Sequence, residues 1–314
     1  MHDGLRFCNT ESEKLSDRLL EILNFSGGKS AFLNSGSEAV NLAISISKNL
    51  TKRNKILKMD CSFLSAYGHG HISPYNLNME TIPMNRIDAI SGIDFSEIAA
   101  FVFEPGNAWG LIKYPENGFI HSLALSIKEN GGLLIANEVT TGFGRTGKWF
   151  GFQHYDYKPD IVSVGKALGN GYPISGVCVT KEISDLFSAS PFRYAQSHQN
   201  DPLGCAVGLE VIQVFNDLQL LEKCLQKGEY FKKLLLQLQS QHKDQIKEIR
   251  ARGLMIALEF NDFKQAENIY NQLIERGFLT GQKENVIRFM PPLVIEENQI
   301  DQLTYNIENI LFNF

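Results

Sequence analysis

The sequence has few cysteines, no long apolar run and no excess of basic charge. Its five cysteines form no CxxC pair and are odd in number, which argues against a disulfide framework or a zinc site. No apolar stretch approaches the roughly 20 residues of a membrane span, and the first residues do not resemble a signal peptide. A net charge of -5 argues against a nucleic-acid-binding face. We therefore expect a cytoplasmic protein that binds neither nucleic acid nor membrane.

Short apolar strands alternate with helices through the first two thirds of the chain. The helices carry apolar residues at helical spacing, for example Leu15, Leu19 and Leu23. Strands without polar alternation are typical of a sheet that is covered on both faces, so the pattern predicts an α/β fold with a mostly parallel sheet. The predicted strands are residues 31–33, 56–59, 99–103, 133–136, 160–164 and 176–179, and residues 62–95 are predicted to be irregular.

The pattern changes beyond about residue 204. Two long helices, over residues 204–215 and 220–242, precede two apolar strands and two further helices. This arrangement predicts a smaller α+β unit. We place the large α/β domain at residues 1–214 and the small C-terminal domain at residues 215–314.

The segment NSGSEA, residues 34–39, places small residues between a predicted strand and a predicted helix. Free backbone N–H groups and the positive end of a helix dipole at such a turn suit one phosphate group. The alternative is an ordinary helix N-cap, with Ser35 or Ser37 bonded to the first turn.

A single lysine, Lys166, ends the apolar strand DIVSV and stands among glycines. Lysine is poorly suited to a buried strand end unless its nitrogen is used there, although a solvated lysine is the simpler alternative. Residues 142–147 match GxGxxG only weakly, because no strand directly precedes the first glycine and no clear helix follows the last. His69 and His71 have no third ligand at a suitable spacing, so a metal site is a minor alternative.

Seven segments occur in one order along the chain. They are NSGSEAV, the EP that follows an apolar strand, LLIANEVTTGFGRTG, PDIVSVGKALGNGYPISG, NDPLGCAVGLEVI, RGLMIALEF and VIRFMPPLVI. In this order the segments resemble the class III aminotransferases, the ω-, ornithine and acetylornithine type of fold-type-I pyridoxal phosphate (PLP) enzymes. The resemblance runs from about residue 5 to the C-terminus. It implies a large PLP-binding domain and a smaller C-terminal domain.

The resemblance also implies roles for individual residues. Lys166 matches the lysine that holds PLP as a Schiff base and then shuttles a proton. Gly36 and Ser37 match the phosphate cradle. Ser197 falls where the family has a threonine that reaches the phosphate of the neighbouring subunit, which implies a homodimer with shared active sites. The remaining cofactor-binding matches are Phe63 and Val139 on the two faces of the ring, and Glu104 and Thr140 near its phenolic oxygen.

Four departures from the family pattern are visible in the sequence. Asn137 stands where the family has the aspartate that keeps the pyridine nitrogen protonated, so transamination is expected to be slowed. Ala66 replaces a carboxylate-binding arginine. Trp109 replaces the glutamate that pairs with the arginine matching Arg288, which leaves Arg288 to bind a substrate carboxylate. The chain is also shorter at its N-terminus than is usual in the family.

The expected activity is transfer of an amino group between an amine or amino acid and a 2-oxo acid. One alternative is a PLP-dependent racemase, epimerase or aminomutase on the same fold. Another is a degenerate homologue that acts as a binding or regulatory protein, which Asn137 and the short N-terminus favour and Lys166 opposes.

Overall fold

The computed structural model describes residues 9–312, apart from residues 72, 74–75, 108–109 and 190–191. The chain forms two compact units. The first comprises Met1–Pro105, Pro115–Phe143 and Gly151–Asn216, and the second comprises Gly106–Tyr114, Gly144–Phe150 and Asp217–Phe314. Two short segments that the sequence places in the large domain therefore belong to the second unit, because their contacts lie with distant parts of the chain.

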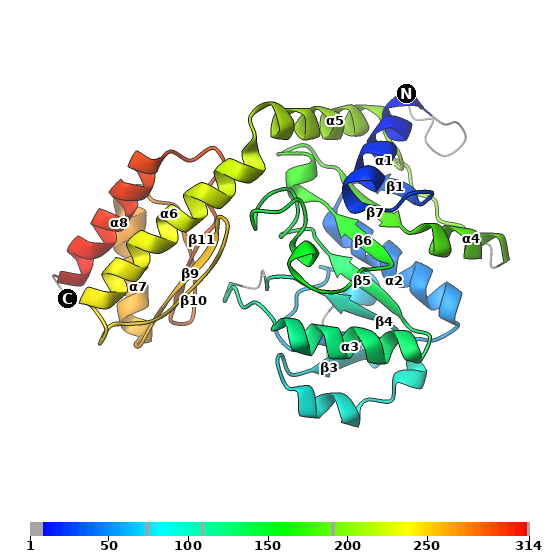
Figure 1. Ribbon diagram of the computed structural model, residues 1–314, viewed down its shortest axis with the longest axis horizontal. Coiled ribbons are helices and arrows are strands. Elements are labelled where there is room, and N and C mark those ends of the chain that lie inside the picture. Colours follow the sequence, from blue (N-terminus) through cyan, green and yellow to red (C-terminus); the bar gives the residue numbers. More distant parts are fainter. Residues whose placement is uncertain (1–8, 72, 74–75, 108–109, 190–191, 313–314) are drawn as a thin grey trace. The chain divides into compact units, whose positions relative to one another are not determined.

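The first unit is built on a seven-stranded sheet in the order β1-β7-β6-β5-β4-β2-β3 (Figure 1). The five strands from β6 to β3 run parallel, while β7 is antiparallel to both β6 and β1. The predicted α/β fold with a mostly parallel sheet is confirmed. The strands are β1 (Lys29–Leu33), β2 (Lys55–Met59), β3 (Met79–Ile82), β4 (Ile98–Phe103), β5 (Leu133–Asn137), β6 (Ile161–Val164) and β7 (Ser175–Val179).

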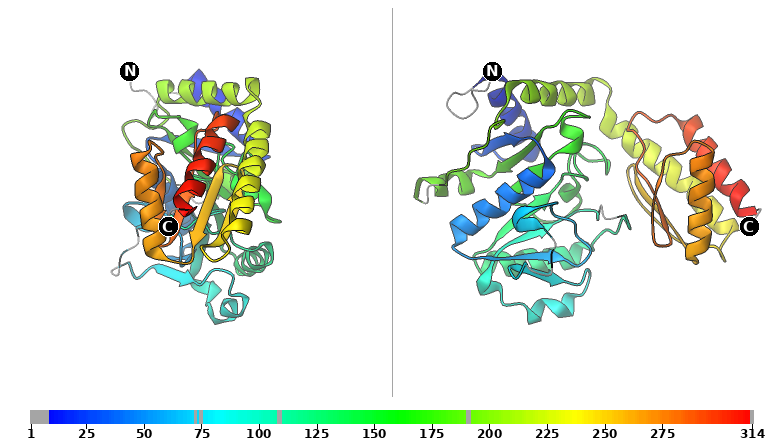
Figure 2. Two further views of the ribbon diagram at one scale, coloured as in Figure 1. Left: turned by 90° about the vertical axis from the view of Figure 1, so that its left-hand side faces the viewer. Right: turned by 180° about the vertical axis from the view of Figure 1, so that it is seen from behind.

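Helices α2 (Gly36–Thr51) and α3 (Asn117–Glu129) cover opposite faces of this sheet (Figure 2). Apolar residues of α2 pack on Val102, Ile135 and Ile161 in one buried cluster. Since both faces are covered, β4 is buried along its whole length and has no polar alternation. The other helices of the unit are α1 (Thr10–Leu23), α4 (Lys181–Ala189) and α5 (Pro202–Asp217), which ends one residue into the second unit.

Three strands were missed by the sequence analysis: β3 in the first unit, and Ile246–Arg252 and Gly281–Lys283 in the second. β3 lies within residues 62–95, which were predicted to be irregular, and it pairs in parallel with β2 at the edge of the sheet. Its sequence METI is short, and only Ile82 is buried, so it carries little apolar signal. Because an edge strand is held mainly by backbone bonds to its neighbour, its presence depends on the position of β2.

The second unit contains a four-stranded antiparallel sheet in the order β10-β11-β9-β8. Its helices α6 (Leu220–Gln241), α7 (Phe263–Glu275) and α8 (Glu297–Phe312) bury one apolar cluster against Ile256, Leu258 and Phe260. Met255 and Ala257 point to the other face and pack with Ile112. The strands are β8 (Ile246–Arg252), β9 (Met255–Phe260), β10 (Gly281–Lys283) and β11 (Val286–Phe289).

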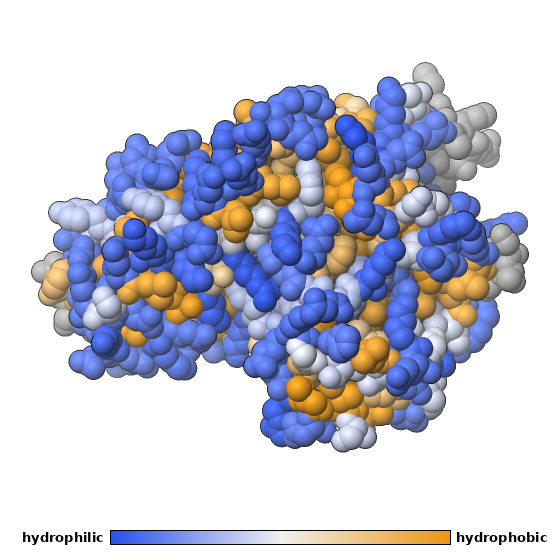
Figure 3. Space-filling model, in the orientation of Figure 1, coloured by the Kyte–Doolittle hydropathy of each residue, from blue (hydrophilic) through white to orange (hydrophobic). Residues whose placement is uncertain are grey.

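Figure 3 shows hydrophilic residues over most of the visible surface, with smaller apolar patches between them. Within the part of the chain that the structure describes, no helix is both long enough and apolar enough to cross a bilayer.

Candidate active site

Four polar side chains lie on one face of the sheet at its carboxyl edge. Lys58 of β2 pairs with Val102 of β4, and Val102 pairs with Ile135 of β5. Because side chains on one face of a strand recur every second residue, Glu104 and Asn137 lie on the same face as Lys58. Asn137 pairs directly with Ser163 of β6. We call Lys58, Glu104, Asn137 and Ser163 the polar row; all four are buried, on the face that α2 covers.

Lys166 follows β6 at this edge and begins a short 3-10 helix, Lys166–Leu168. Its side chain is exposed, and its Nζ donates to the hydroxyl oxygen of Thr140 at 2.6 Å. The backbone φ of Lys166 is +44°, in the left-handed region that costs a residue with a Cβ about 1 kcal/mol or more. Residues in such strained conformations are more frequent at active sites, so the strain marks Lys166 as a candidate functional residue.

The turn before α2 presents unpaired backbone N–H groups. The Ser35 hydroxyl caps the Glu38 N–H, and the Glu38 carboxylate accepts from the N–H groups of Asn34 and Ser35. The N–H groups of Gly36 and Ser37 have no acceptor among the described residues. A helix N-terminus with two such donors binds an anion. The capping role of Ser35 is therefore compatible with a phosphate at Gly36 and Ser37.

Gly36 packs against Val139 without room for a side chain. A Cβ on Gly36 would lie 2.4 Å from Val139 Cγ1, which is closer than atoms in contact can approach. Gly165, next to Lys166, lies in contact with both residues: a Cβ there would be 3.4 Å from Gly36 Cα and 3.5 Å from Val139 Cγ1. The N-terminus of α2 at Gly36, the side chain of Val139 and the end of β6 next to Lys166 therefore lie in contact. The Ser175 hydroxyl donates to the Ser35 carbonyl at 2.7 Å and holds the turn there.

The backbone of Phe63 is held between two members of the polar row. Its N–H donates to Glu104 Oε2 at 2.8 Å, and its carbonyl accepts from Asn137 Nδ2 at 3.3 Å. Asn137 Oδ1 in turn accepts from the Val139 N–H at 3.3 Å. Glu104 and Asn137 thereby place the aromatic side chain of Phe63, which is partly exposed, relative to Val139.

Burial changes the protonation of both acidic groups near the site. It raises the pKa of Glu104 to about 8, although the Phe63 N–H, Lys166 and Lys58 all act to lower it. It also raises the pKa of Glu138 to about 7, against hydrogen bonds from Thr141, Gly151 and Phe152. Both carboxyl groups therefore titrate near neutral pH, which is common at catalytic sites.

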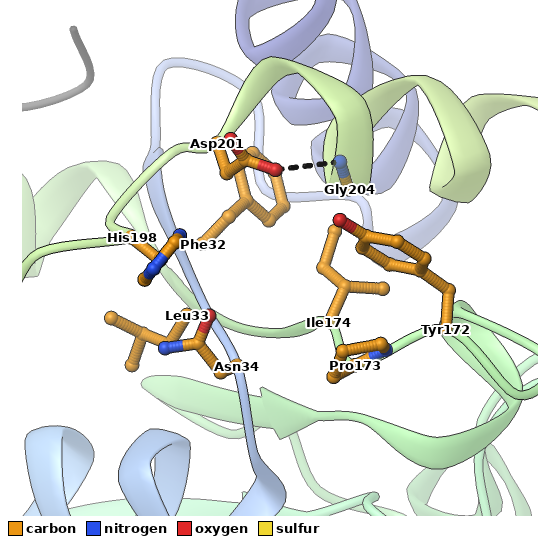
Figure 4. A pocket seen from close by; sticks show the side chains of 9 residues that line it. All are labelled: Phe32, Leu33, Asn34, Tyr172, Pro173, Ile174, His198, Asp201 and Gly204. Carbon is orange, nitrogen blue, oxygen red and sulfur yellow. Dashed lines mark hydrogen bonds between the residues drawn. The ribbon is translucent and has the colours of Figure 1, made fainter. Parts of the chain in front are cut away.

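The loop that carries Ser197 is bonded to β1 and to the turn before α2. The Asn200 N–H donates to the Phe32 carbonyl at 2.9 Å, and Asn200 Oδ1 accepts from the Phe32 N–H at 2.8 Å. Gln196 Oε1 accepts from Asn34 Nδ2 at 3.1 Å. Ser197 itself is exposed. A cavity of about 220 Å³ lies beside this loop, lined by Asn34 and His198 on one side and Tyr172 and Pro173 on the other (Figure 4).

The remaining predicted residues belong to the second unit, adjoin the turn before α2 or fall outside the described part of the chain. Arg288 belongs to β11 of the second unit, where it lies over Gly281 of β10. Trp109 lies outside the described residues. The Ala66 N–H donates to the Ser37 hydroxyl at 3.0 Å, so the position of the expected arginine adjoins the turn before α2.

The glycine-rich loop GFGRTG is not a dinucleotide site. Residues 139–150 form turns rather than a helix, and Gly144–Phe150 belongs to the second unit. Arg145 in this loop donates to the carbonyl oxygens of Leu254 at 3.1 Å and Pro291 at 2.6 Å. Across the described ranges there is also no group of three His, Cys, Asp or Glu side chains that could hold a metal ion.

Sequence reasoning missed three residues of the site. Lys58 is buried in β2, and Ser163 Oγ is buried without a partner among the described residues. Glu138 is fully buried and accepts the bonds of Thr141, Gly151 and Phe152 through its carboxylate. A polar residue within an apolar strand was the available signal for Lys58 and Ser163.

The residues present fit PLP. The paired donors of Gly36 and Ser37 suit its phosphate, the absence of a Cβ at Gly36 lets Val139 pack directly against the turn, and the Lys166 amine suits its aldehyde. A mostly parallel sheet with a helix N-terminus and a lysine at its carboxyl edge matches the PLP-dependent transferase of fold type I that the sequence resemblance implies.

The family model of the class-III aminotransferases matches residues 65–311, and the chain belongs to this family. An acetylornithine aminotransferase of Caldanaerobacter subterraneus subsp. tengcongensis is 35% identical over 329 residues, covering 99% of this chain and 82% of the relative. An ornithine aminotransferase of Bacillus subtilis is 36% identical over 248 residues, covering 78% of this chain and 59% of the relative.

Solved structures agree with this assignment. The acetylornithine aminotransferase of Elizabethkingia anophelis superposes with a TM-score of 0.86 at 29% identity and covers 100% of this chain and 82% of that one. The ornithine aminotransferase of Toxoplasma gondii, crystallised with partial occupancy of PLP, has a TM-score of 0.87 at 25% identity and covers 98% of this chain and 77% of that one. The protein is a PLP-dependent aminotransferase that moves an amino group between an amine or amino acid and a 2-oxo acid.

Proposed function

We propose that Lys166 is the catalytic residue and that the carboxyl edge of the first unit is the cofactor site. The supporting observation is the 2.6 Å bond from Lys166 Nζ to Thr140, opposite the N-terminus of α2. In this proposal Gly36 and Ser37 bind the phosphate through their N–H groups, and Phe63 and Val139 pack against the two ring faces. Asn137, Glu104 and Thr140 bind polar atoms of the ring.

In this proposal, Lys166, Thr140 and Val139 have separate roles in proton transfer. When bound, PLP supplies an electron sink that stabilises negative charge at the substrate carbon. Lys166 Nζ removes the proton from that carbon and returns it to the product side. Thr140 orients the amine by accepting its hydrogen bond, and Val139 excludes water from one side.

We propose an amino donor of the ornithine type, with a terminal amino group, and a 2-oxo dicarboxylic acid as acceptor. The names of the relatives support the donor. Arg288, a permanent cation in β11, is proposed to bind a substrate carboxylate. Ala66 in place of arginine removes a second cation, so the donor is expected to bind more weakly when it depends on two carboxylate contacts.

The experiment is a transamination assay with 2-oxoglutarate and either ornithine, N-acetylornithine or a simple terminal amine, with glutamate as the measured product. Borohydride reduction of the loaded protein followed by mass spectrometry should locate PLP on Lys166. Lys166→Ala should abolish both signals, whereas Lys181→Ala, which changes an exposed lysine paired with Asp185, should leave both intact. Cofactor attached elsewhere, or full activity in Lys166→Ala, would contradict the proposal.

Asn137 gives a second proposal, that of an enzyme with reduced transamination. Its amide is 6% exposed and already engages Phe63 and Val139, so it can donate to a ring nitrogen but supplies no negative charge. Every ~1.4 kcal/mol of carbanion stabilisation lost slows the reaction about tenfold. Racemisation of a chiral amino acid without consumption of a 2-oxo acid would favour the racemase alternative instead.

We also propose a cytoplasmic homodimer in which Ser197 completes the phosphate site of the partner subunit. Ser197 is exposed on a loop fixed to β1 by Asn200, so its hydroxyl is presented outward. Sedimentation should give twice the chain mass, and Ser197→Ala should weaken PLP binding without changing the dimer. A monomer that binds PLP fully would contradict this part.

A further inference from the structure

Glu138 is a fully buried acidic residue that the proposed chemistry does not use. Its Oε2 accepts from the Thr141 hydroxyl at 2.6 Å and from the Gly151 N–H at 2.8 Å, and its Oε1 accepts from the Phe152 N–H at 2.6 Å. A buried carboxylate needs such donors in place of the water that it has lost. We call these three hydrogen bonds the Glu138 clamp, because they join two separate segments of the chain.

The backbone of Glu138 is bonded on both sides as well. Its N–H donates to the Ser163 carbonyl of β6 at 2.9 Å, and its carbonyl accepts from the Gly142 N–H at 3.0 Å. β6 is the strand that leads directly to Lys166. Bonds to one residue therefore close the turn over residues 138–142 and attach its start to the strand that carries the lysine.

This turn contains two residues of the proposed site. Thr140 Oγ1 accepts from Lys166 Nζ at 2.6 Å, and Val139 lies against the N-terminus of α2. Both side chains are branched at Cβ and have little rotational freedom, so the backbone of the turn sets where they point. A displacement of about 1 Å in a catalytic arrangement can slow a reaction about a hundredfold. The backbone of the turn must therefore be held accurately.

The chain leaves the first unit shortly after the turn. Gly144–Phe150 belongs to the second unit, and the chain returns to the first unit at Gly151. The Glu138 clamp binds the chain on both sides of this excursion, at Thr141 before it and at Gly151 after it. A Cβ on Gly151 would lie 2.7 Å from Pro105 Cβ, so the returning chain is also tightly packed. The clamp therefore anchors the turn within the first unit.

We propose that Glu138 is a positioning residue of the active site: its buried carboxylate holds the turn in which Thr140 orients the Lys166 amine. Val139 is held by the same turn. The inference rests on the proposed function for its catalytic meaning. The Glu138 clamp itself is a property of the chain alone, so it is tested without any measurement of activity.

The test substitutes Glu138→Gln in the full chain, loaded with PLP and after PLP removal. Measurements are made at pH 8, above the Glu138 pKa of about 7, where the carboxylate is mainly ionised. Both carboxylate oxygens accept from backbone N–H groups, of Gly151 and of Phe152. The amide of glutamine has only one oxygen, so its NH2 group must face one of these donors. The substitution keeps the shape of the side chain but breaks the clamp.

NMR relaxation of labelled methyl groups measures the mobility of Val139 and Thr140. The signals lost in Val139→Ala and Thr140→Ser identify the two residues. The order parameters of both should fall in Glu138→Gln, with PLP and without it. In the loaded enzyme kcat should fall about tenfold, whereas KM for the 2-oxo acid, which is proposed to depend on Arg288, should stay within about twofold.

Asp160→Asn is the matched control for a general loss of stability. Asp160 is another buried carboxylate of the first unit; its Oδ2 accepts from the Leu134 N–H at 2.7 Å, and its Oδ1 pairs with Lys128. It lies at the opposite end of β6 from Lys166. Asp160→Asn should lower the free energy of unfolding but leave both methyl order parameters unchanged. An equal loss of order in Asp160→Asn, or unchanged order in folded Glu138→Gln, would overturn the inference.

A second pair of variants keeps the inference testable if Glu138→Gln does not fold. Thr141→Val removes the bond that joins the carboxylate to the turn itself, and Thr141→Ser keeps that bond. Greater mobility of the Val139 and Thr140 methyl groups is expected in Thr141→Val, and wild-type mobility is expected in Thr141→Ser. The same mobility in both variants would overturn the inference.

The failure of this inference differs from the failure of the proposed function. If the two methyl groups become mobile in Glu138→Gln but PLP does not attach to Lys166, the proposed function fails while the structural role of the clamp stands. If PLP attaches to Lys166 and the methyl groups of Glu138→Gln remain as ordered as in the wild-type chain, the proposed function stands and the inference fails.

Discussion

Asn137 and Phe63 are joined by a hydrogen bond from Asn137 Nδ2 to the Phe63 carbonyl at 3.3 Å. This contact fixes which side of the amide is the donor, since Asn137 Oδ1 accepts from the Val139 N–H. An aspartate at this position would place a carboxylate oxygen against the Phe63 carbonyl.

Asn137→Asp should therefore have opposite effects on stability and rate. Without PLP, the Phe63 carbonyl has lost its donor and faces a carboxylate oxygen, and the free energy of unfolding should fall by about 1–3 kcal/mol. With PLP, the negative charge supplies the missing ring partner, and transamination should rise about tenfold or more. Urea unfolding of the cofactor-free chain and single-turnover rates measure the two effects. The prediction requires faster turnover in Asn137→Asp than in the wild-type chain. An unchanged rate would show that the charge at the ring nitrogen does not limit the reaction.

Thr140→Val should slow catalysis without unfolding the protein. The change preserves shape but removes the hydroxyl that accepts from Lys166 Nζ at 2.6 Å. Loss of one hydrogen bond to the neutral amine, about 0.5–1.5 kcal/mol, corresponds to roughly a two- to tenfold fall in kcat/KM. Steady-state kinetics measure the change, and Thr140→Ser, which keeps the hydroxyl, is the control. An unchanged kcat/KM in Thr140→Val, or an equal loss in Thr140→Ser, would contradict the role of the hydroxyl.

Gly36→Ala should disrupt the turn before α2. The new Cβ would lie 2.4 Å from Val139 Cγ1, so one of the two must move, and such overpacking costs about 1–3 kcal/mol. The midpoint temperature of thermal unfolding should fall, and the PLP dissociation constant should rise. The double variant Gly36→Ala with Val139→Ala removes the clash and should recover stability relative to Gly36→Ala. Without such recovery, the contact with Val139 would not be the cause.

Glu138→Gln should change how stability depends on pH. The folded pKa of about 7 lies above the ordinary value of 4.5, so the folded chain binds the extra proton between these pH values. The stabilisation that Glu138 gives the folded chain by binding this proton is present in full below pH 4.5, and it is lost as the pH rises through 7. Glu138→Gln removes this titrating group, so the fall in the free energy of unfolding between pH 5 and 7 should become less steep, by up to about 1.4 kcal/mol per pH unit. Urea unfolding at several pH values measures this, and an unchanged slope would contradict the assignment.

The sequence alone indicated a large part of the fold. Apolar strands such as Ala99–Phe103 carry their signal locally, because a strand covered on both faces consists mainly of apolar residues. β3 escaped notice because its pairing with β2 depends on a distant neighbour. Likewise, the assignment of Gly144–Phe150 to the second unit rests on contacts such as those of Arg145 with Leu254 and Pro291, which no local pattern encodes.

The sequence by itself determined the α/β class, the lysine at the end of β6 and the small-residue turn before α2, because each depends on neighbouring residues in the chain. Only the tertiary structure decided that Lys58, Glu104, Asn137 and Ser163 share one sheet face. It also decided that Glu104 and Asn137 hold Phe63 between them. The physical reason is strand register: backbone bonds between strands far apart in the chain select which side chains become neighbours, and burial then sets their charge.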